Sequence, residues 1–177
     1  LMNGLIWLAP WAETVAGETG VDNDGNEIQL TVNEDAQTAA IVFKTVVDPF
    51  VGKLVYFKVV SGKVTSDMTL LNMRTGANER IGKLYFVCGK KQIEASKIKA
   101  GDIGCTAKLE GTKTGDTLCA SGKDIILTGI DFPAPVLSMA VKPKAKGDEE
   151  KIVSLYDSGA INFFIVRMVS QNLFSTT

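Results

Sequence analysis

Two neighbouring stretches decide the fold: AAIVFKTVV at residues 39–47 and KLVYFKVV at residues 53–60. Both are rich in β-branched and aromatic residues, and both alternate between apolar and polar positions or run apolar without a break. Runs of this composition are typical of β-strands that are buried on at least one face. The sequence therefore predicts two strands here, in the first half of the chain.

Similar short runs continue along the chain. Turn dipeptides such as Ser61-Gly62, Thr75-Gly76 and Thr114-Gly115 separate several of them, and no long helical pattern lies between. Many short strands at this spacing indicate a mostly β fold, either an antiparallel barrel or a sandwich, and closing the sheet would remove its exposed edges. The further strand candidates are residues 68–73, 79–88, 102–109, 116–120 and 125–127.

The segment before these strands has a different character. Residues 1–8 can form about two turns of helix, which Pro10 would end. Residues 13–38 are acidic and polar, so we expect a linker with a turn at Asp24-Gly25. The run DNDGNE at residues 22–27 resembles a calcium loop, but an EF-hand needs glycine at the sixth position, where Glu27 stands. A hairpin turn or linker is favoured.

The segment after the strands begins at a boundary. The sequence FPAP at residues 132–135 predicts a stiff, extended connection. Beyond it, strands at 136–141 and 162–169 and a helix that begins at Asp148 predict a partial α+β segment. The architecture is thus expected to change near residue 132.

Charge is distributed unevenly although the formal net charge is only −1. Residues 1–40 contain seven acidic residues and no Lys or Arg, whereas residues 41–100 contain eleven Lys or Arg against four acids, a surplus of seven. Such asymmetry indicates an anionic partner for the middle of the chain. A solvated sheet surface that happens to use lysine would give the same count, so charge alone leaves both interpretations open.

Residue types exclude several kinds of chemistry. The chain has no histidine, which removes Ser-His-Asp and Cys-His catalysis and the usual zinc sites. Its three cysteines, Cys88, Cys105 and Cys119, are scattered without a CxxC pair, as expected of free thiols in a reducing compartment. Gly62-Lys63 is followed by Val64 with no glycine five residues ahead, so it is not a phosphate loop. The apolar residues 5–12 are too few to span a bilayer.

Several motifs resemble domain II of elongation factor G, a translational GTPase. Lys44, DPFVGKL at residues 48–54 and VSG at 60–62 are similar to the opening of that domain. The resemblance covers about residues 1–152, and so many motifs in one order are poorly explained by coincidence. The further matches, in chain order, are LN at 71–72, ERIGKL at 79–84, IKAGDI at 98–103, TGDTLC at 114–119, FPAPV at 132–136, KPK at 142–144, Asp148 and Lys151.

The resemblance implies a domain organisation. It predicts the end of a GTPase domain at residues 1–12, an acidic linker at 13–38, a closed antiparallel β-barrel of the translation-factor domain II type at 39–131, and the start of domain III at 132–177. Agreement decays beyond Ser154, so domain III is expected to be incomplete or altered. The sequence CGKKQ at residues 88–92 replaces the family's histidine and other basic residues, which indicates a divergent copy of the factor.

The resemblance also implies a function. The barrel would bind small-subunit ribosomal RNA and contact the parent's own GTPase domain and domain III during translocation, in the cytoplasm and away from membranes. GTP and magnesium would belong to the parent protein, while this chain would be non-catalytic and bind no cofactor or metal. A rigid basic surface suits the phosphates of folded RNA. The candidate contacts are Lys53, Lys58, Ser61, Gly62, Lys63, Arg74, Lys83, Lys90 and Lys91, within a basic set that also includes Arg80.

Other functions remain open at this point. The runner-up within the family is domain II of a ribosomal-protection or peptide-release GTPase, which shares the barrel. A generic OB-like barrel that binds single-stranded RNA would expose aromatic residues on one face. An enzyme on a small barrel is disfavoured by the missing histidine and phosphate loop. We expect packing in the core or on sheet faces for Tyr56, Phe57, Tyr85 and Phe86.

Small residues in the turns are expected to serve backbone geometry. Positive φ angles are predicted at Gly52, Gly62, Gly101 and Gly115, because each stands in a tight turn. The carboxylates of Asp102 and Asp116 are expected to accept hydrogen bonds from backbone N–H groups within their turns. Neither carboxylate is expected to act as a general acid or base.

Overall fold

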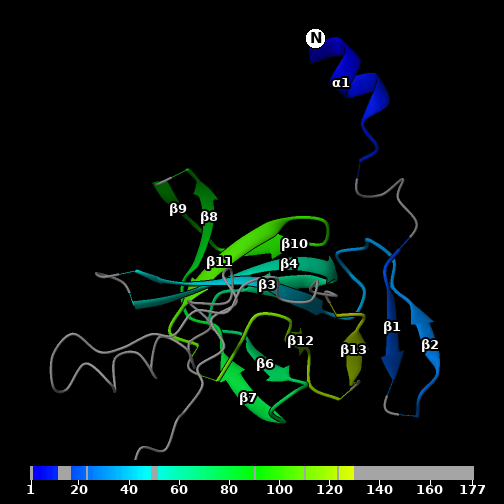
Figure 1. The fold of residues 1–177 in the computed structure, drawn as a ribbon, viewed down its shortest axis with the longest axis vertical. Coiled ribbons are helices and arrows are strands. Elements are labelled where there is room, and N and C mark those ends of the chain that lie inside the picture. The colour runs from blue at the N-terminus through cyan, green and yellow to red at the C-terminus, as the bar shows by residue number, and fades with distance from the viewer. Residues whose placement is uncertain are drawn as a thin grey trace, which may run out of the picture.

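The computed structural model describes residues 2–11, 17–22, 24–48, 52–89, 91–109, 111–122 and 124–129. This part of the chain is mostly β and its strands pair antiparallel (Figure 1). The elements are α1 (Met2–Leu8), β1 (Thr19–Asp22), β2 (Glu27–Gln29), β3 (Ala39–Asp48), β4 (Gly52–Ser61), β5 (Lys63–Thr65), β6 (Thr69–Asn72), β7 (Ala77–Arg80), β8 (Leu84–Cys88), β9 (Lys91–Ala95), β10 (Lys97–Lys99), β11 (Ile103–Ala107), β12 (Thr117–Cys119) and β13 (Ile125–Leu127).

The two stretches that decide the fold form the centre of the largest sheet. Its eight strands run in the order β7-β6-β12-β3-β4-β11-β8-β9, so β3 and β4 lie side by side in the middle. Register shifts at Ala39/Ala40 and at Val42/Lys44 interrupt the β3–β4 ladder. Such bulges bend a strand and increase its twist. The sheet can therefore curve around its own core.

The main core fills the concave side of this sheet. Val55, Phe57 and Val59 alternate along β4 and are each 1% exposed or less. They pack with side chains from the neighbouring strands, such as Leu84 and Leu118. Burial of a large apolar side chain contributes about 1.5–3 kcal/mol, so this alternating pattern fixes which face of β4 turns inward.

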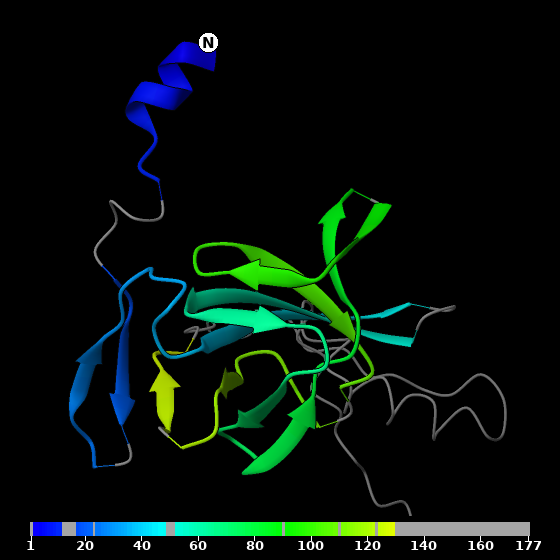
Figure 2. The ribbon, with the colours of Figure 1, turned by 180° about the vertical axis from the view of Figure 1, so that it is seen from behind.

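A second, smaller core joins the N-terminal segment to the sheet. Strands β13, β1 and β2 form a three-stranded sheet in that order. Leu30, which follows β2, is 6% exposed and packs with Ile41 and Val60 of the large sheet and Ile125 and Leu127 of β13. Figure 2 shows the β1–β2 hairpin beside the main sheet. The acidic segment is thus held against the body of the domain.

The sequence predicted most of these elements. The strands expected at 39–47, 53–60, 68–73, 102–109, 116–120 and 125–127 correspond to β3, β4, β6, β11, β12 and β13, and the helix expected at 1–8 is α1. The run 79–88 is wrong as a single strand: it divides into β7 and β8, which residues 81–83 separate. The strands β1, β2, β5, β9 and β10 were not predicted.

Two other expectations are confirmed, and a third lies outside the described part of the chain. The four glycines expected at positive φ have φ angles of 83° (Gly52), 73° (Gly62), 89° (Gly101) and 94° (Gly115). The turn expected at Asp24-Gly25 joins β1 to β2, so the predicted linker contains a hairpin. The boundary at 132–135, the strands at 136–141 and 162–169, and the helix at Asp148 lie outside the described residues.

The ladders of the large sheet end at β7 on one side and at β9 on the other. Over the described ranges, the structure therefore establishes a curved antiparallel sheet, without a ladder that joins its two end strands. The β8–β9 hairpin projects from the body, and α1 stands apart from the sheets (Figures 1 and 2). In this part of the chain, no helix is long and apolar enough to cross a membrane.

Candidate nucleic-acid interface

The most concentrated positive charge lies on the β5–β10 ladder. Lys63 of β5 is directly opposite Lys99 of β10, and Lys97 is opposite Thr65. Val64 and Ile98 between them are fully buried, so the alternation of the strands places the three lysines on the opposite, outer face. Like charges directly opposite each other destabilise a sheet unless another charge compensates them. The ladder thus presents ammonium groups that need an anion.

Two consecutive acids supply that anion from within the chain. Lys99 Nζ lies 2.6 Å from Glu34 Oε2, and Lys63 Nζ lies 3.3 Å from Asp35 Oδ1. The hydrogen bond from Lys99 is the main cause of the lowered pKa of Glu34, and the same bond raises the pKa of Lys99. The four side chains keep between 37% and 80% exposure. The Lys63–Asp35 pair is therefore open to water and to competing ions, whereas in the Lys99–Glu34 pair the Oε2 atom of Glu34 is itself buried.

The backbone around Gly62 holds these acids in place. Gly62 N–H donates to the Asn33 carbonyl at 2.8 Å, and Thr38 Oγ1 donates to the Lys63 carbonyl at 2.8 Å. A Cβ on Gly62 would meet Thr38 Cα at 2.6 Å and the Ala36 carbonyl oxygen at 2.8 Å. Only glycine lets the acidic segment approach β5 this closely.

A third acid from the same N-terminal segment neutralises β4. Lys58 Nζ lies 2.6 Å from Glu18 Oε1, and both side chains are a little over 40% exposed. Leu30 N–H donates to the Glu18 carbonyl at 2.9 Å, which ties Glu18 to the anchored part of the segment. We call residues 17–36 the acidic strap, because three of its carboxylates pair with lysines of β4, β5 and β10.

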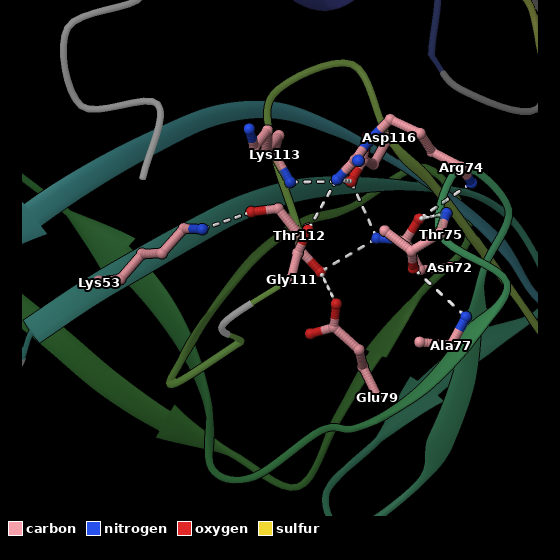
Figure 3. Close-up of polar contacts among 10 residues, drawn as sticks. All are labelled: Lys53, Asn72, Arg74, Thr75, Ala77, Glu79, Gly111, Thr112, Lys113 and Asp116. Carbon is pink, nitrogen blue, oxygen red and sulfur yellow. Dashed lines mark hydrogen bonds and ion pairs between the residues drawn. The ribbon is translucent and has the colours of Figure 1, made fainter. Parts of the chain in front are cut away.

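Arg74 belongs to a different environment (Figure 3). Its guanidinium donates to both carboxylate oxygens of Asp116, at 2.6 and 3.0 Å, and to the Gly111 carbonyl at 2.7 Å. Asp116 also accepts from Asn72 Nδ2 and from the backbone N–H of Lys113, each at 2.8 Å, and its side chain is 3% exposed. This Arg74–Asp116 cluster joins the turn after β6 to the loop before β12.

The carboxylate of Asp116 is charged because its neighbours outweigh its burial. Burial is the largest single influence and would raise its pKa. The hydrogen bonds from Arg74, Lys113 N–H and Asn72 together hold the pKa below the ordinary value of 3.8. The bond from Lys113 N–H confirms the expected role of Asp116 in its turn.

Lys53 lies beside the same loop. It projects from β4 toward Thr112, and its Nζ donates to the Thr112 carbonyl at 2.5 Å (Figure 3). Burial lowers the pKa of Lys53, while the charge of Glu79 opposes that shift. Thr112 in turn donates its hydroxyl to Glu79 at 2.7 Å. Because Lys53 and Lys58 are five residues apart on β4, they lie on opposite faces of the strand.

The remaining candidates lie on or beside the β8–β9 hairpin. Lys83 pairs with Glu94 at 3.1 Å, Lys91 is exposed on β9, and Lys90 lies outside the described residues. Phe86 is 37% exposed opposite Ile93, which is 55% exposed. Phe86 therefore lies opposite Ile93 on the hairpin, outside the buried core, whereas Phe57 is buried in the core; both places fall within the expected packing in the core or on sheet faces.

The structure thus distributes eight of the nine sequence candidates over three places, while Lys90 lies outside the described residues. Lys58, Ser61, Gly62 and Lys63 lie along the acidic strap, Arg74 and Lys53 around Asp116, and Lys83 and Lys91 at the hairpin. Ser61 is 1% exposed, and the N–H of Gly62 is used by the strap.

Sequence reasoning missed Lys97 and Lys99 as candidate contacts. The signal was the alternation Lys-Ile-Lys at residues 97–99, with a buried apolar residue between two outward cations.

Other chemistry finds little support in the described residues. Among them, no three histidine, cysteine, aspartate or glutamate side chains gather in a way that could hold a metal ion. All three cysteines are free, as predicted: Cys88 is exposed, while Cys105 and Cys119 are buried. Burial raises the pKa of Cys105 to about 11, which keeps this thiol protonated and unreactive.

Comparisons with known proteins agree with the architecture. Residues 37–121 match the family model of elongation factor G domain 2. A protein from Thermus thermophilus, whose crystal structure has been solved, is similar with a TM-score of 0.58 and 28% sequence identity. The match covers 70% of this chain and 19% of that protein, so the chain spans about a fifth of the longer protein's length.

The described residues thus form a mostly β domain in which many charged side chains pair with one another. Residues 37–121 are thus similar to domain 2 of elongation factor G, in agreement with the resemblance of the sequence motifs.

Proposed function

We propose that this domain binds the ribosome, within a translational GTPase that acts in translocation. The observation that carries the proposal is the outer face of β5 and β10, where Lys63, Lys97 and Lys99 gather on paired strands of an elongation factor G domain 2. Lys58 of β4 and Lys91 of β9 extend the set of cations. The expected partner is folded small-subunit ribosomal RNA, which presents closely spaced phosphates to a rigid surface.

The proposal assigns different roles to the other candidates. Arg74 and Lys53 hold the loop before β12, so they contribute to RNA binding only by shaping the domain. Ser61 and Gly62 hold the acidic strap in position. Completion of the curved sheet to the closed barrel of translation-factor domains belongs to the proposal too. The proposal also includes contacts with the parent's GTPase domain and domain III. It includes a cytoplasmic location as well, because a ribosome-binding factor acts where protein synthesis takes place.

GTP hydrolysis is proposed for another part of the parent protein. The 177-residue sequence contains no phosphate loop, whose backbone N–H groups would cradle the phosphates, so GTP and magnesium would be held elsewhere. The domain would transmit binding of the ribosome, without performing chemistry itself.

The test compares two double variants that change the charge equally. Lys97→Gln with Lys99→Gln removes one exposed and one ion-paired cation from β10. The matched control, Lys44→Gln with Arg80→Gln, likewise removes one exposed cation and one that pairs with an acid, Asp67. Binding of the full chain to purified small ribosomal subunits is measured by light scattering or filter retention across a salt series.

We expect the β10 variant to bind several-fold more weakly, and the slope of log affinity against log salt to fall by about 1.5, because each lost phosphate contact removes about 0.7–0.9 of a released counterion. The control should change both quantities much less. Equal losses in the two variants would mean general cationic attraction, and no loss in either would mean that these lysines are only solvated surface.

A further inference from the structure

The acidic first segment and the basic middle segment of the sequence neutralise each other within the folded chain, in addition to the RNA binding proposed above. The acids of the strap and the lysines of the sheet pair with each other: Glu18 with Lys58, Glu34 with Lys99 and Asp35 with Lys63. Three of the seven acids in residues 1–40 are therefore placed on cations of residues 41–100. The same cations carry the proposed RNA interface, so two kinds of anion compete for them.

The backbone of the strap cannot easily leave this position. The Asn33 carbonyl accepts a hydrogen bond from Gly62 N–H, and Leu30 is buried in the second core. Just after the strap, the Thr38 hydroxyl donates a hydrogen bond to the Lys63 carbonyl. The side chains of the three pairs are between 37% and 80% exposed, so most of their charged groups are held loosely, although the Oε2 atom of Glu34 is buried. Exposed ion pairs of this kind exchange partners at little free-energy cost. Competition thus takes place at the side chains and leaves the strap anchored.

We propose that the acidic strap is a built-in competitor for RNA, whose carboxylates of Glu18, Glu34 and Asp35 partly mask Lys58, Lys99 and Lys63 and weaken binding until phosphates replace them. This proposal rests on the function proposed above and adds a regulatory element to the same surface. Each carboxylate acts twice: it occupies an ammonium group, and its own negative charge repels the approaching phosphates within about 10 Å at ~0.1 M salt.

The acidic strap also stabilises the unbound domain. Lys63 and Lys99 face each other directly across the β5–β10 ladder, where two uncompensated positive charges would repel. Glu34 and Asp35 relieve that repulsion in the unbound domain. RNA phosphates would relieve it equally well in the complex. The positive charges of the ladder are therefore compensated both in the free domain and in the RNA complex. The strap determines how strongly the free domain is favoured over the complex.

The decisive variant neutralises the strap without changing its shape: Glu18→Gln with Glu34→Gln and Asp35→Asn. The control neutralises three acids that form no ion pair with these lysines among the described residues: Glu27→Gln, which lies in the strap, with Asp67→Asn and Glu94→Gln, which pair with Arg80 and Lys83. Both variants raise the net charge by three. Affinity of the full chain for purified small ribosomal subunits is measured across a salt series, with thermal unfolding to verify folding.

We expect the strap variant to bind roughly tenfold more tightly near 0.1 M salt, since each exposed pair contributes only a few-fold. Its salt slope should steepen by about 2 as three lysines gain phosphates. The control should gain no more than two- to threefold. Equal gains in both variants, or no gain in the strap variant, would overturn the proposal. Should the triple variant fail to fold, Asp35→Asn alone, at the most exposed of the six partners, must still tighten binding.

The outcome separates this proposal from the one on which it rests. If the Lys97→Gln, Lys99→Gln variant binds more weakly but the strap variant binds no better than the unaltered chain, the RNA interface stands and the masking is wrong. If the lysine variant loses nothing, the interface itself is wrong, whatever the strap variant does.

Discussion

The acidic strap and the Arg74–Asp116 cluster both join distant segments through ion pairs, but they differ in how the charges are buried. The Asp116 side chain is 3% exposed and receives four hydrogen bonds, from two guanidinium nitrogens, one amide and one backbone N–H. The three strap carboxylates that pair with lysines, those of Glu18, Glu34 and Asp35, belong to side chains at least 37% exposed, and each has one lysine as its ion-pair partner among the described residues.

That difference decides which cations can serve a partner. Removing a buried carboxylate whose hydrogen bonds are all made leaves polar groups without partners in a low-dielectric environment. Separating Arg74 from Asp116 therefore costs a large free energy, which keeps the cluster closed. An exposed pair has water and salt as ready substitutes. We therefore expect a basic residue to contribute to the proposed RNA binding only where its existing partner is replaceable, as at Lys63, and not where it is fixed, as at Arg74.

The largest effect should come from breaking the cluster. Asp116→Ala removes the acceptor of Arg74, Asn72 and the Lys113 N–H, and we expect a loss of about 3 kcal/mol in the free energy of unfolding. Urea denaturation followed by circular dichroism measures it. Asp35→Asn at the strap is the comparison and should leave the urea midpoint nearly unchanged. Similar losses in both variants would erase the distinction between the two regions.

A glycine pair tests how firmly the strap is anchored. Gly62→Ala places a Cβ against the backbone of Thr38 and Ala36 at a φ of 73°, so we expect a loss of about 2–3 kcal/mol. Gly76→Ala is the control, because its φ of 68° is similar but nothing lies within 4 Å. It should lose about 1 kcal/mol from backbone strain alone. An equal loss in both would show that the close approach of the strap contributes nothing.

Acid should reveal the charge of Asp116. Its pKa is held below 3.8 in the folded domain, so its contribution to stability is complete above the unfolded value of about 3.9 and disappears as the pH falls through the lower folded value. The difference in stability between the unaltered chain and Asp116→Asn should therefore be constant from about pH 7 to 5 and shrink below about pH 4. Urea midpoints between pH 7 and 2.5 measure this, and a difference that grows in acid would contradict it.

The smallest effect concerns thiols and leaves stability unchanged. Cys88 on the projecting hairpin is exposed, whereas burial raises the pKa of both Cys105 and Cys119. A thiol-specific reagent should modify one cysteine quickly in the native chain and all three after denaturation. Rapid native modification of all three would mean that the central strands β11 and β12 open far more often than their burial implies.

The sequence predicted the central strands because their physics is local. Apolar and β-branched runs such as residues 39–47 and 53–60 carry the pattern of a half-buried strand within a few residues. The short strands β5, β9 and β10 carry no such signal: Lys97-Ile-Lys99 has one buried residue, and β9 has none. Their formation depends on a neighbouring strand that supplies the ladder and the core.

For the candidate interface, the sequence predicted only which segments are basic and which are acidic. Counting charges identified a basic middle segment and an acidic beginning, and the motifs identified the domain. Which lysines share a face, and which acids cover them, could not be read from spacing, because Glu34 and Lys99 are far apart in sequence and meet only through the β5–β10 ladder and the Gly62 contact. Arg74 was indistinguishable from a surface cation until its partner Asp116 was located.

By itself, then, the sequence determined the class of fold, the positive-φ turns, the free thiols and the resemblance to elongation factor G domain 2, since each of these depends on residue type or on short-range pattern. The tertiary structure alone decided the use of each charge. A charge interacts with whatever lies within a few ångströms in space, and burial sets the strength of that interaction. Both quantities are fixed only when distant strands and the acidic strap come together.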